Sequence, residues 1–171
     1  RVRKAFALVI DAIALNDATE DVQPRTRAGW FDVGTPSART PAELDKIPGF
    51  RKPTEEDIAT AKQLLVDAGY PGCQGMAVLE IPTRDLPDAR ILVPAVQVMI
   101  KQNLGCESET SIHQTSAIGE VFREGKFHIV PSTMGSHGVP GSAGGAALRK
   151  CDEPDNTLRY CNPEFDKVVN A

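Results

Sequence analysis

The sequence predicts an α/β fold in which a mostly parallel sheet is flanked by helices. Between residues 54 and 130, segments with helical periodicity alternate with short segments that have strand character. The length of 171 residues suits one domain, and the hydrophobic fraction of 41% and charged fraction of 25% are those of a globular protein. Alternating helices and strands are typical of parallel sheets whose faces are covered by helices.

The first part of the chain contains one expected helix and a long irregular segment. Residues 1–13 carry an apolar stripe at helical spacing, so we expect a helix there. Residues 16–53 lose this periodicity, and we expect an irregular excursion with one short helix at TPAELDKI, residues 40–47. A loop of that length inside a domain is usually functional or packed on a neighbour.

The middle and last parts of the chain supply the remaining elements. Thr54 is a good N-cap and Gly69 a good stop, which predicts a helix between them. In a later helix, Pro94 must lie in the first turn or kink the helix. The further helices are expected at 88–105, 115–125 and 162–171, and the strands at 76–81, 106–113 and 126–130.

The stretch FHIVPSTMGSHGVPGSAGG, residues 127–145, follows the last expected strand. It has five glycines between Gly135 and Gly145, and residues 127–148 contain no Asp, Glu, Lys or Arg. Ligands in such sheets bind beyond the carboxyl ends of the strands, and small uncharged residues let a ligand approach the backbone closely. We therefore predict a ligand-binding wall here and a second contact near the cleft, with these residues: Met134, Gly135, Ser136, His137, Gly29 and Trp30.

Other kinds of chemistry have weaker support in the sequence. The chain has no GxxxxGK[ST] or GxGxxG phosphate loop, and its net charge of −4 argues against a nucleic-acid partner. A hydrolase using His137 with a nearby serine stays an alternative, although no GxSxG elbow is present. His113, His128 and His137 lack the spacing of a metal site, so we expect no metal and no cofactor.

The four cysteines do not form a CxxC motif, which argues against a zinc knuckle or a thioredoxin-type site. Cys151 and Cys161 bracket the turn-rich segment CDEPDNTLRYC. A disulfide closing this short loop would fit an oxidising compartment. The sequence leaves open whether the two thiols are bonded.

Five segments, taken in order, resemble one family: RVRKAFALVIDAIAL, PTEEDIATAKQLLVDAGYPG, VQVMIKQNLGCESET, FREGKFHIVPSTMG and YCNPEFDKVV. They are similar to the second major lobe of the extracytoplasmic solute-binding proteins of ABC importers, family 5, the oligopeptide and dipeptide binding class. The resemblance covers nearly the whole chain and is weakest between Asn16 and Pro53. Each segment alone is a mild signal, but five in order at matching spacing are specific.

The resemblance implies a lobe of the periplasmic-binding-protein type II-like fold. Residues 1–171 would form a single ligand-binding lobe of a two-lobe protein, a view that the absence of an initiator Met and of signal-peptide features also favours. The intact protein would close on a peptide or peptide-like solute and deliver it to an ABC permease in the membrane. It would be a monomer without catalytic activity, periplasmic or extracellular, either soluble or anchored as a lipoprotein.

The chain departs from the family at the predicted wall. Peptide-binding members often have Gly-Trp at the positions of Thr133 and Met134, followed by an Asp at the position of His137. In some of them that Asp pairs with the α-amino group of the peptide. A histidine cannot form the same charge-assisted hydrogen bond to an ammonium group. The departure argues against the ordinary free-amine mode and keeps a sugar or a metal as alternative cargo.

Overall fold

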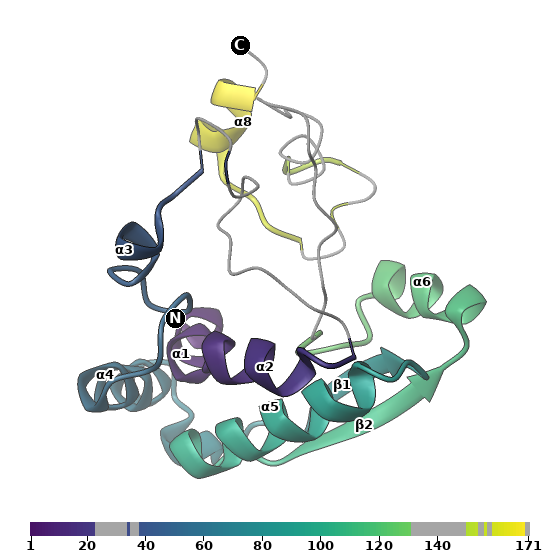
Figure 1. Cartoon of the computed structure of the whole chain (residues 1–171), viewed down its shortest axis with the longest axis horizontal. Coiled ribbons are helices and arrows are strands. Elements are labelled where there is room, and N and C mark those ends of the chain that lie inside the picture. The colour runs from purple at the N-terminus through teal and green to yellow at the C-terminus, as the bar shows by residue number, and fades with distance from the viewer. Residues whose placement is uncertain (23–33, 35–37, 131–149, 154–155, 157–158, 170–171) are drawn as a thin grey trace.

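The computed structural model describes residues 1–22, 34, 38–130, 150–153, 156 and 159–169 (Figure 1). Within these residues a small parallel sheet is flanked by helices, so the predicted fold class is confirmed. The elements in chain order are α1 Val2–Val9, α2 Ala12–Thr19, α3 Pro41–Leu44, α4 Glu55–Val66, the 3₁₀ turn η1 Pro71–Cys73, β1 Leu79–Arg84, α5 Ala89–Leu104, β2 Ser108–His113, α6 Thr115–Glu124 and α8 Pro163–Val169.

The single helix expected at residues 1–13 is instead two helices. The backbone is extended at Ile10, and Asp11 caps the next helix by accepting hydrogen bonds from the backbone N–H groups of Ile13 and Ala14 at 3.1 and 3.0 Å. Asn103 of α5 donates to the carbonyl oxygen of Val9, which α1 leaves without a helical partner. The apolar stripe continues through the break, so periodicity alone could not reveal it. The second helix also extends to Thr19, into the segment expected to be irregular.

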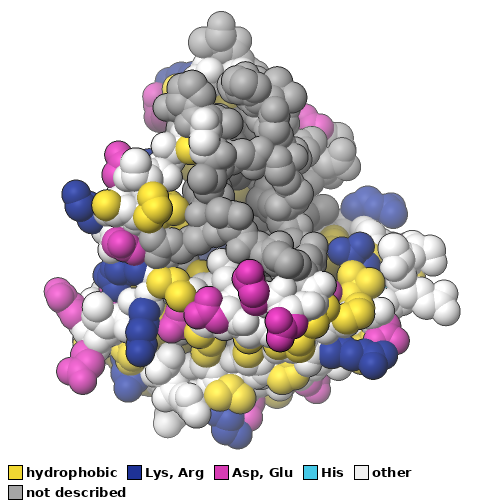
Figure 2. All heavy atoms as spheres, viewed as in Figure 1, with side chains coloured by type: hydrophobic (Ala, Val, Ile, Leu, Met, Phe, Trp, Pro, Cys, Tyr) yellow, Lys and Arg dark blue, Asp and Glu magenta, His cyan; other side chains and the backbone are white. Residues whose placement is uncertain are grey.

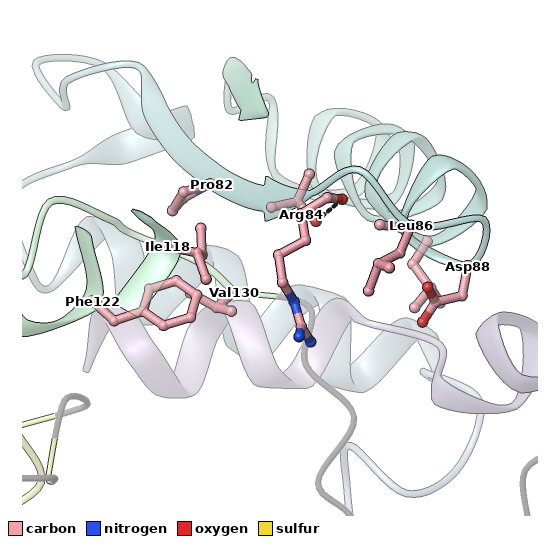
Figure 3. A pocket seen from close by; sticks show the side chains of 10 residues that line it. Pro82, Arg84, Leu86, Asp88, Ile118, Phe122 and Val130 are labelled. Carbon is pink, nitrogen blue, oxygen red and sulfur yellow. Dashed lines mark hydrogen bonds between the residues drawn. The ribbon is translucent and has the colours of Figure 1, made fainter. Parts of the chain in front are cut away.

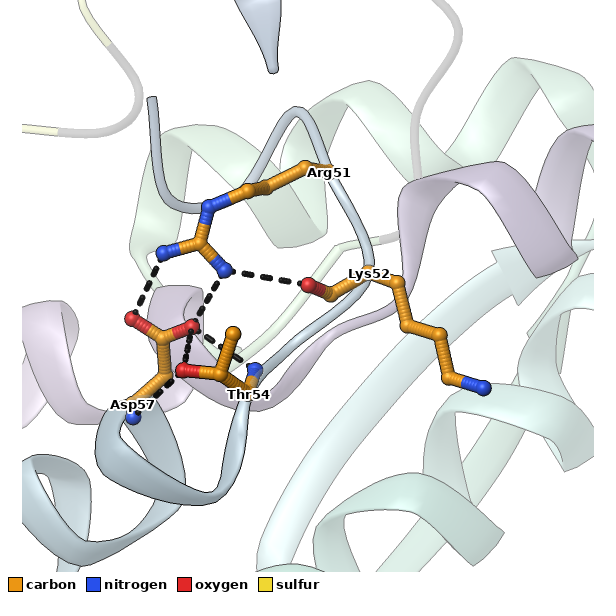
Figure 4. A network of polar contacts seen from close by, with 4 residues as sticks. All are labelled: Arg51, Lys52, Thr54 and Asp57. Carbon is orange, nitrogen blue, oxygen red and sulfur yellow. Dashed lines mark hydrogen bonds and ion pairs between the residues drawn. The ribbon is translucent and has the colours of Figure 1, made fainter. Parts of the chain in front are cut away.

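Capping residues determine where helices α3 and α4 begin. Thr40 and Glu43 form a capping box at α3, inside the predicted range 40–47. Thr54 and Asp57 form a second capping box at α4, as the sequence predicted for Thr54. Arg51 adds a fork of two hydrogen bonds to the Asp57 carboxylate, at 2.5 and 3.1 Å (Figure 4). These contacts tie the connection after α3 to the start of α4.

Strands β1 and β2 form a two-stranded parallel sheet within the described residues. The register pairs Leu79 with Ser108 and continues without interruption to Arg84 and His113. The strand predicted at 76–81 therefore begins and ends three residues later, at Leu79 and Arg84. Pro82, just beyond the predicted end at Ile81, lies inside the strand and is buried.

Pro82 fits in β1 because its nitrogen faces away from β2. Leu79 donates its N–H to Glu107, just before β2, so odd-numbered residues of β1 point their backbone groups toward β2. Even-numbered residues point to the opposite edge, where Glu80 accepts hydrogen bonds from His128 and Ile129. The missing N–H of Pro82 therefore interrupts that opposite edge and leaves the ladder with β2 intact.

The strand predicted at 126–130 is not present as a regular strand. Residues 127–130 do lie beside β1, where the N–H groups of His128 and Ile129 donate to the Glu80 carbonyl at 2.9 and 3.3 Å. A parallel ladder needs evenly spaced donors and acceptors on both partners, and Pro82 removes the next donor of β1. The segment accordingly contacts β1 at one point instead of along a ladder.

Helix α5 contacts both strands and is surrounded by α1, α2 and α4 (Figure 1). It begins at Ala89 and ends before Gly105, whose φ of +79° is the left-handed cap that the sequence indicated. Pro94 lies in the second turn on the exposed side, one turn later than the first-turn alternative. The hydrophobic core joins residues of α1, α4, β1 and α5, including Val9, Leu65, Ile81 and Ile100.

The last described part of the chain is a short loop followed by α8. Asn156 is buried and its side chain donates to the carbonyl oxygens of Lys150 and Tyr160 at 2.9 and 2.6 Å, which holds the two ends of this loop together. The Cys151 N–H donates to the Asp166 carboxylate of α8. Helix α8 begins at Pro163, where the sequence predicted a helix start, and its described part ends at Val169.

Two disulfides are present, and each joins one cysteine to the next cysteine along the chain. Cys151 is bonded to Cys161, which closes the short loop, with a Cα–Cα distance of 4.3 Å. Cys73 is bonded to Cys106, which ties η1 to the residues before β2, with a Cα–Cα distance of 5.1 Å. This second bond could not be predicted from local sequence, because the two cysteines are 33 positions apart and two secondary-structure elements lie between them.

The surface carries charges of both signs. On the face shown in Figure 2, acidic and basic side chains are both spread over the described part of the surface. Within the described residues, none of the helices combines the length and the apolar character that crossing a membrane requires.

Candidate functional site

An open pocket lies at the carboxyl end of β1 (Figure 3). It is small, with a volume of about 50 Å³, and opens to solvent. Strand β1 and the turn after it supply one side, the first turns of α5 a second side, and α6 with the segment before residue 131 a third. The lining residues are Pro82, Thr83, Arg84, Leu86, Asp88, Ala89, Leu92, Ile118, Phe122 and Val130.

Apolar side chains form the floor of the pocket, while polar atoms make up the larger part of its exposed lining. Leu92 and Ile118 are buried at its floor, each with 6% of its surface exposed, while Leu86, Phe122 and Val130 are half-buried. The ring of Phe122 meets that of Phe127 edge to face, with ring centroids 5.6 Å apart. This aromatic contact fastens residues 127–130 to α6, so that Val130 stays beside the α6 residues of the wall.

Arg84 supplies the positive charge of the pocket. It is the last residue of β1, is exposed, and extends its guanidinium into the hollow (Figure 3). This guanidinium makes no hydrogen bond or ion pair to another residue that the structure describes. The neighbouring Arg90 is different, because it donates two hydrogen bonds to Asp85, at 3.0 and 2.8 Å. Arg84 is therefore available to pair with an anionic group in the pocket.

The ligand-binding residues predicted from the sequence lie outside the described residues. These are Met134, Gly135, Ser136 and His137 in the glycine-rich loop, and Gly29 and Trp30 in the excursion. The described pocket nevertheless adjoins that loop in the chain, since Val130 lines it and residue 131 follows. The prediction of a wall by these six residues stays a prediction.

Sequence reasoning missed the residues that line the described pocket. Arg84 lies beyond the strand end expected at Ile81, and Phe122 lies within the helix expected at 115–125, so neither is among the predicted site residues. The usable signal was position: Arg84 follows an apolar run and precedes a helix, which is where the carboxyl end of a parallel strand lies.

The metal and nucleophile alternatives gain no support from the described residues. Within them, no group of three or more His, Cys, Asp or Glu side chains lies close enough to hold a metal ion. His113 is hydrogen-bonded to the Ser111 hydroxyl at 3.0 Å, and this pair does not line the pocket. The serines considered with His137 as a hydrolase centre lie outside the described residues, as does His137 itself.

No family model matches the chain, and no curated protein matches it. Solved structures match it over almost its whole length. A periplasmic oligopeptide-binding protein of an ABC transporter from Borrelia burgdorferi is 20% identical, with a TM-score of 0.70, 99% of this chain covered and 32% of that one. The murein tripeptide binding protein of Escherichia coli is 25% identical, with a TM-score of 0.72 and coverages of 98% and 32%.

A third structure, the periplasmic EDTA-binding protein EppA, is 18% identical with a TM-score of 0.76 and coverages of 99% and 33%. At these identities the likeness establishes the fold. It confirms the resemblance to ABC-importer solute-binding proteins of the oligopeptide class that the sequence indicated. The chain spans about a third of the length of the solved structures that it matches.

Proposed function

We propose that this chain, whose fold is that of one part of the oligopeptide-binding proteins of ABC transporters, is a solute-binding lobe of such a protein. The intact protein would enclose its solute between this lobe and a partner lobe, by a hinge motion. It would then present the solute to an ABC permease in the membrane. On this proposal residues 1–171 form a single lobe that works as a monomer, with no nucleic-acid partner, and the site binds without catalysing a reaction.

The observation that carries the proposal is the pocket at the carboxyl end of β1. Its position is where open α/β sheets bind ligands. Its lining combines apolar side chains with two charged ones, Arg84 and Asp88. The glycine-rich loop that follows Val130 would extend this wall with Met134, Gly135, Ser136 and His137. Gly29 and Trp30 would contribute from the excursion.

The solute we propose combines an apolar group with a carboxylate. The apolar group would lie against Leu86, Leu92 and Phe122, and the carboxylate would pair with Arg84 as a charge-assisted hydrogen bond. A free amino group would not be required, since His137 stands where an acidic partner is common in peptide binders. A peptide or peptide-like solute without a free amine fits these conditions better than a sugar, which would leave Arg84 unpaired.

The location we propose is periplasmic or extracellular, for either a soluble protein or a lipoprotein. The matching Borrelia and EDTA-binding proteins are described as periplasmic. Two disulfides within the described residues support an oxidising compartment as well, because thiols in the cytosol are usually kept reduced.

The test is a thermal-shift screen of the intact protein against peptides, sugars and divalent metals. The peptides are offered in pairs, with a free or amidated C-terminus and with a free or acetylated N-terminus. A ligand that binds only the folded state raises the melting temperature by mass action. We expect shifts from peptides with a free carboxylate and an apolar side chain. We expect acetylation to leave these shifts in place and amidation to abolish them.

Two variants test whether the charge of Arg84 itself, and not any positive charge near the pocket, binds the solute. Arg84→Gln should weaken binding of the carboxylate peptides by about ten- to a hundredfold, as expected for loss of a charged hydrogen bond. Arg90→Gln removes a neighbouring charge that is already paired with Asp85 and should leave binding unchanged. Equal losses in both variants, or shifts only with sugars or metals, would contradict the proposal.

A further inference from the structure

The imidazole of His128 occupies an unusual place at the free edge of β1. The backbone N–H of Glu80 donates a hydrogen bond to Nδ1 of His128 at 2.9 Å, while the carbonyl of Glu80 accepts from the His128 N–H at 2.9 Å. A neighbouring strand would normally offer a backbone carbonyl to that donor. Here a side chain replaces it, and the residue is bound to Glu80 through both its backbone and its ring.

Pro82 makes this one contact important. It is the next residue of β1 that faces the same edge, and it has no N–H to donate. The Glu80 N–H is therefore the last donor of β1 before Arg84 along this edge. Removal of its acceptor would leave residues 127–130 attached to β1 by the two bonds to the Glu80 carbonyl.

We propose that His128 is a positioning residue for the solute pocket and that its neutral imidazole is the form that holds the pocket wall. Nδ1 can accept only when it carries no proton, so the bound ring has its proton on Nε2. The ring is exposed to solvent and can take up a second proton as the pH falls. Protonation removes the acceptor, and the wall at Val130 then loses one of its attachments to β1.

The charged groups on the neighbouring elements do not replace this contact. Strand β1 carries Glu80, whose backbone binds the ring, and Arg84 at its carboxyl end. The Glu80 carboxylate interacts with Glu109 of β2. Helix α6 carries Glu120, Arg123 and Glu124, and Glu124 is paired with Lys126 at 2.8 Å. The hydrogen bond to Nδ1 comes from a backbone amide, which no change of pH in this range alters. Only the ring itself can switch the bond.

The inference rests on the proposed function for its meaning, because Val130 matters as a wall residue only if the pocket binds a solute. The ring attaches the pocket wall to β1 only while Nδ1 carries no proton. A solute-binding lobe built in this way would hold its solute less firmly in an acidified environment.

The test follows the isotope-labelled 171-residue chain by nuclear magnetic resonance and needs no solute. At about pH 7.5 the nitrogen spectrum of His128 should show an unprotonated Nδ1 and a protonated Nε2. Between about pH 7.5 and pH 5, the protection of the Glu80 amide from hydrogen exchange should fall about tenfold beyond the intrinsic pH effect. The Val130 and Phe122 resonances should shift over the same pH interval.

Three variants identify the cause. His128→Asn keeps a side-chain acceptor that does not titrate, so Glu80 should stay protected at both pH values. His128→Ala should lose the protection at both, and His113→Asn, which alters a histidine outside the pocket, should behave like the parent chain. A protonated Nδ1 at about pH 7.5, or an equal pH response in the parent and His128→Asn, would overturn the proposal. Solute screening of the intact protein tests the function separately.

Discussion

Asp57 shows how one side chain can hold together the start of a helix. Its carboxylate accepts from Arg51 and from both the N–H and the hydroxyl of Thr54, the last two at 2.8 Å (Figure 4). The hydrogen bond from Arg51, assisted by those from Thr54, lowers the pKa of Asp57 to about 2. An unfolded aspartate titrates near pH 4, so the folded state favours the ionised form.

The first prediction concerns acid stability. Because the folded pKa of Asp57 is lowered, its contribution to the free energy of unfolding is complete above about pH 4 and is lost as the pH falls toward 2. Asp57→Asn should reduce the free energy of unfolding at neutral pH by about 1–2 kcal/mol and flatten this part of the acid transition. Urea denaturation at a series of pH values measures both effects.

The matched control for Asp57 is Glu56→Gln in the same helical turn. Glu56 is exposed and lies outside the capping box, so its neutralisation should change the free energy of unfolding only slightly. A loss in Glu56→Gln as large as that in Asp57→Asn would show that overall charge near the helix start, and not the cap, carries the stability.

Glu109 is an example of the opposite sign. It is the register partner of Glu80 across the two strands, and the hydrogen bond and charge of Glu80 raise the pKa of Glu109. Folding therefore favours its protonated form. The resulting stability is present below the ordinary pKa of a glutamate and is lost as the pH rises through the raised value.

The second prediction is that Glu109→Gln stabilises the chain at neutral pH. The substitution removes repulsion between carboxylates directly opposite each other, so the melting temperature at pH 7 should rise. The gain should shrink as the pH is lowered and Glu109, whose pKa is raised, becomes protonated in the parent. Calorimetry at pH 7 and pH 4 makes the comparison, and a gain of equal size at both values would exclude repulsion as the cause.

At the scale of elements, one glycine inside α6 and one directly after it have different roles. Gly125 ends the helix at a φ of +72°, and a Cβ there would lie 2.7 Å from the Arg159 side chain. Arg159 comes from the loop closed by Cys151 and Cys161 and donates to the Glu124 carbonyl at 3.2 Å. Gly119 lies inside the helix, and a Cβ there would meet nothing within 4 Å.

The third prediction uses this contrast. Gly125→Ala should lower the free energy of unfolding by about 1 kcal/mol or more, because it strains a left-handed residue and displaces the arginine that caps α6. Gly119→Ala should raise it by up to about 1 kcal/mol, since alanine favours the helix and no neighbour is disturbed. Denaturant titration of both variants tests the pair, and changes of the same sign would refute the assignment.

Helices were easier to predict than strand boundaries because their signals are local. Thr54 and Gly105 mark ends through their own backbone and side-chain preferences, and both were identified. The end of β1 depends on the neighbouring strand. Pro82 is compatible with β1 because β2 pairs with the edge opposite to the one that Pro82 faces, and the local sequence does not contain that information. The pocket was difficult to predict for the same reason, because Arg84 lies at the carboxyl end of β1 only if the strand continues past Ile81.

At the scale of the whole molecule, the two disulfides close segments of very different length. The Cys73–Cys106 bond spans 33 residues and reaches the core at the fully buried Cys106, whereas Cys151–Cys161 spans 10 residues in a loop. Cross-linking a longer segment removes more freedom from the unfolded chain.

The fourth prediction ranks the two bonds. Replacing Cys73 and Cys106 together by alanine should cost about 2–5 kcal/mol of the free energy of unfolding, and replacing Cys151 and Cys161 together should cost less. Equilibrium unfolding in urea gives both values. A larger loss for the Cys151 and Cys161 pair than for the Cys73 and Cys106 pair would contradict this ranking.

The order of the disulfides along the chain also bears on how the protein reaches its native pairing. Of the three ways to join four cysteines, the structure uses the one in which each bond is complete before the next cysteine is reached. A chain that enters an oxidising compartment from its N-terminus would expose Cys73 and Cys106 first and pair them while Cys151 is still absent. For these four cysteines, delivery from the N-terminus would favour the observed pairing.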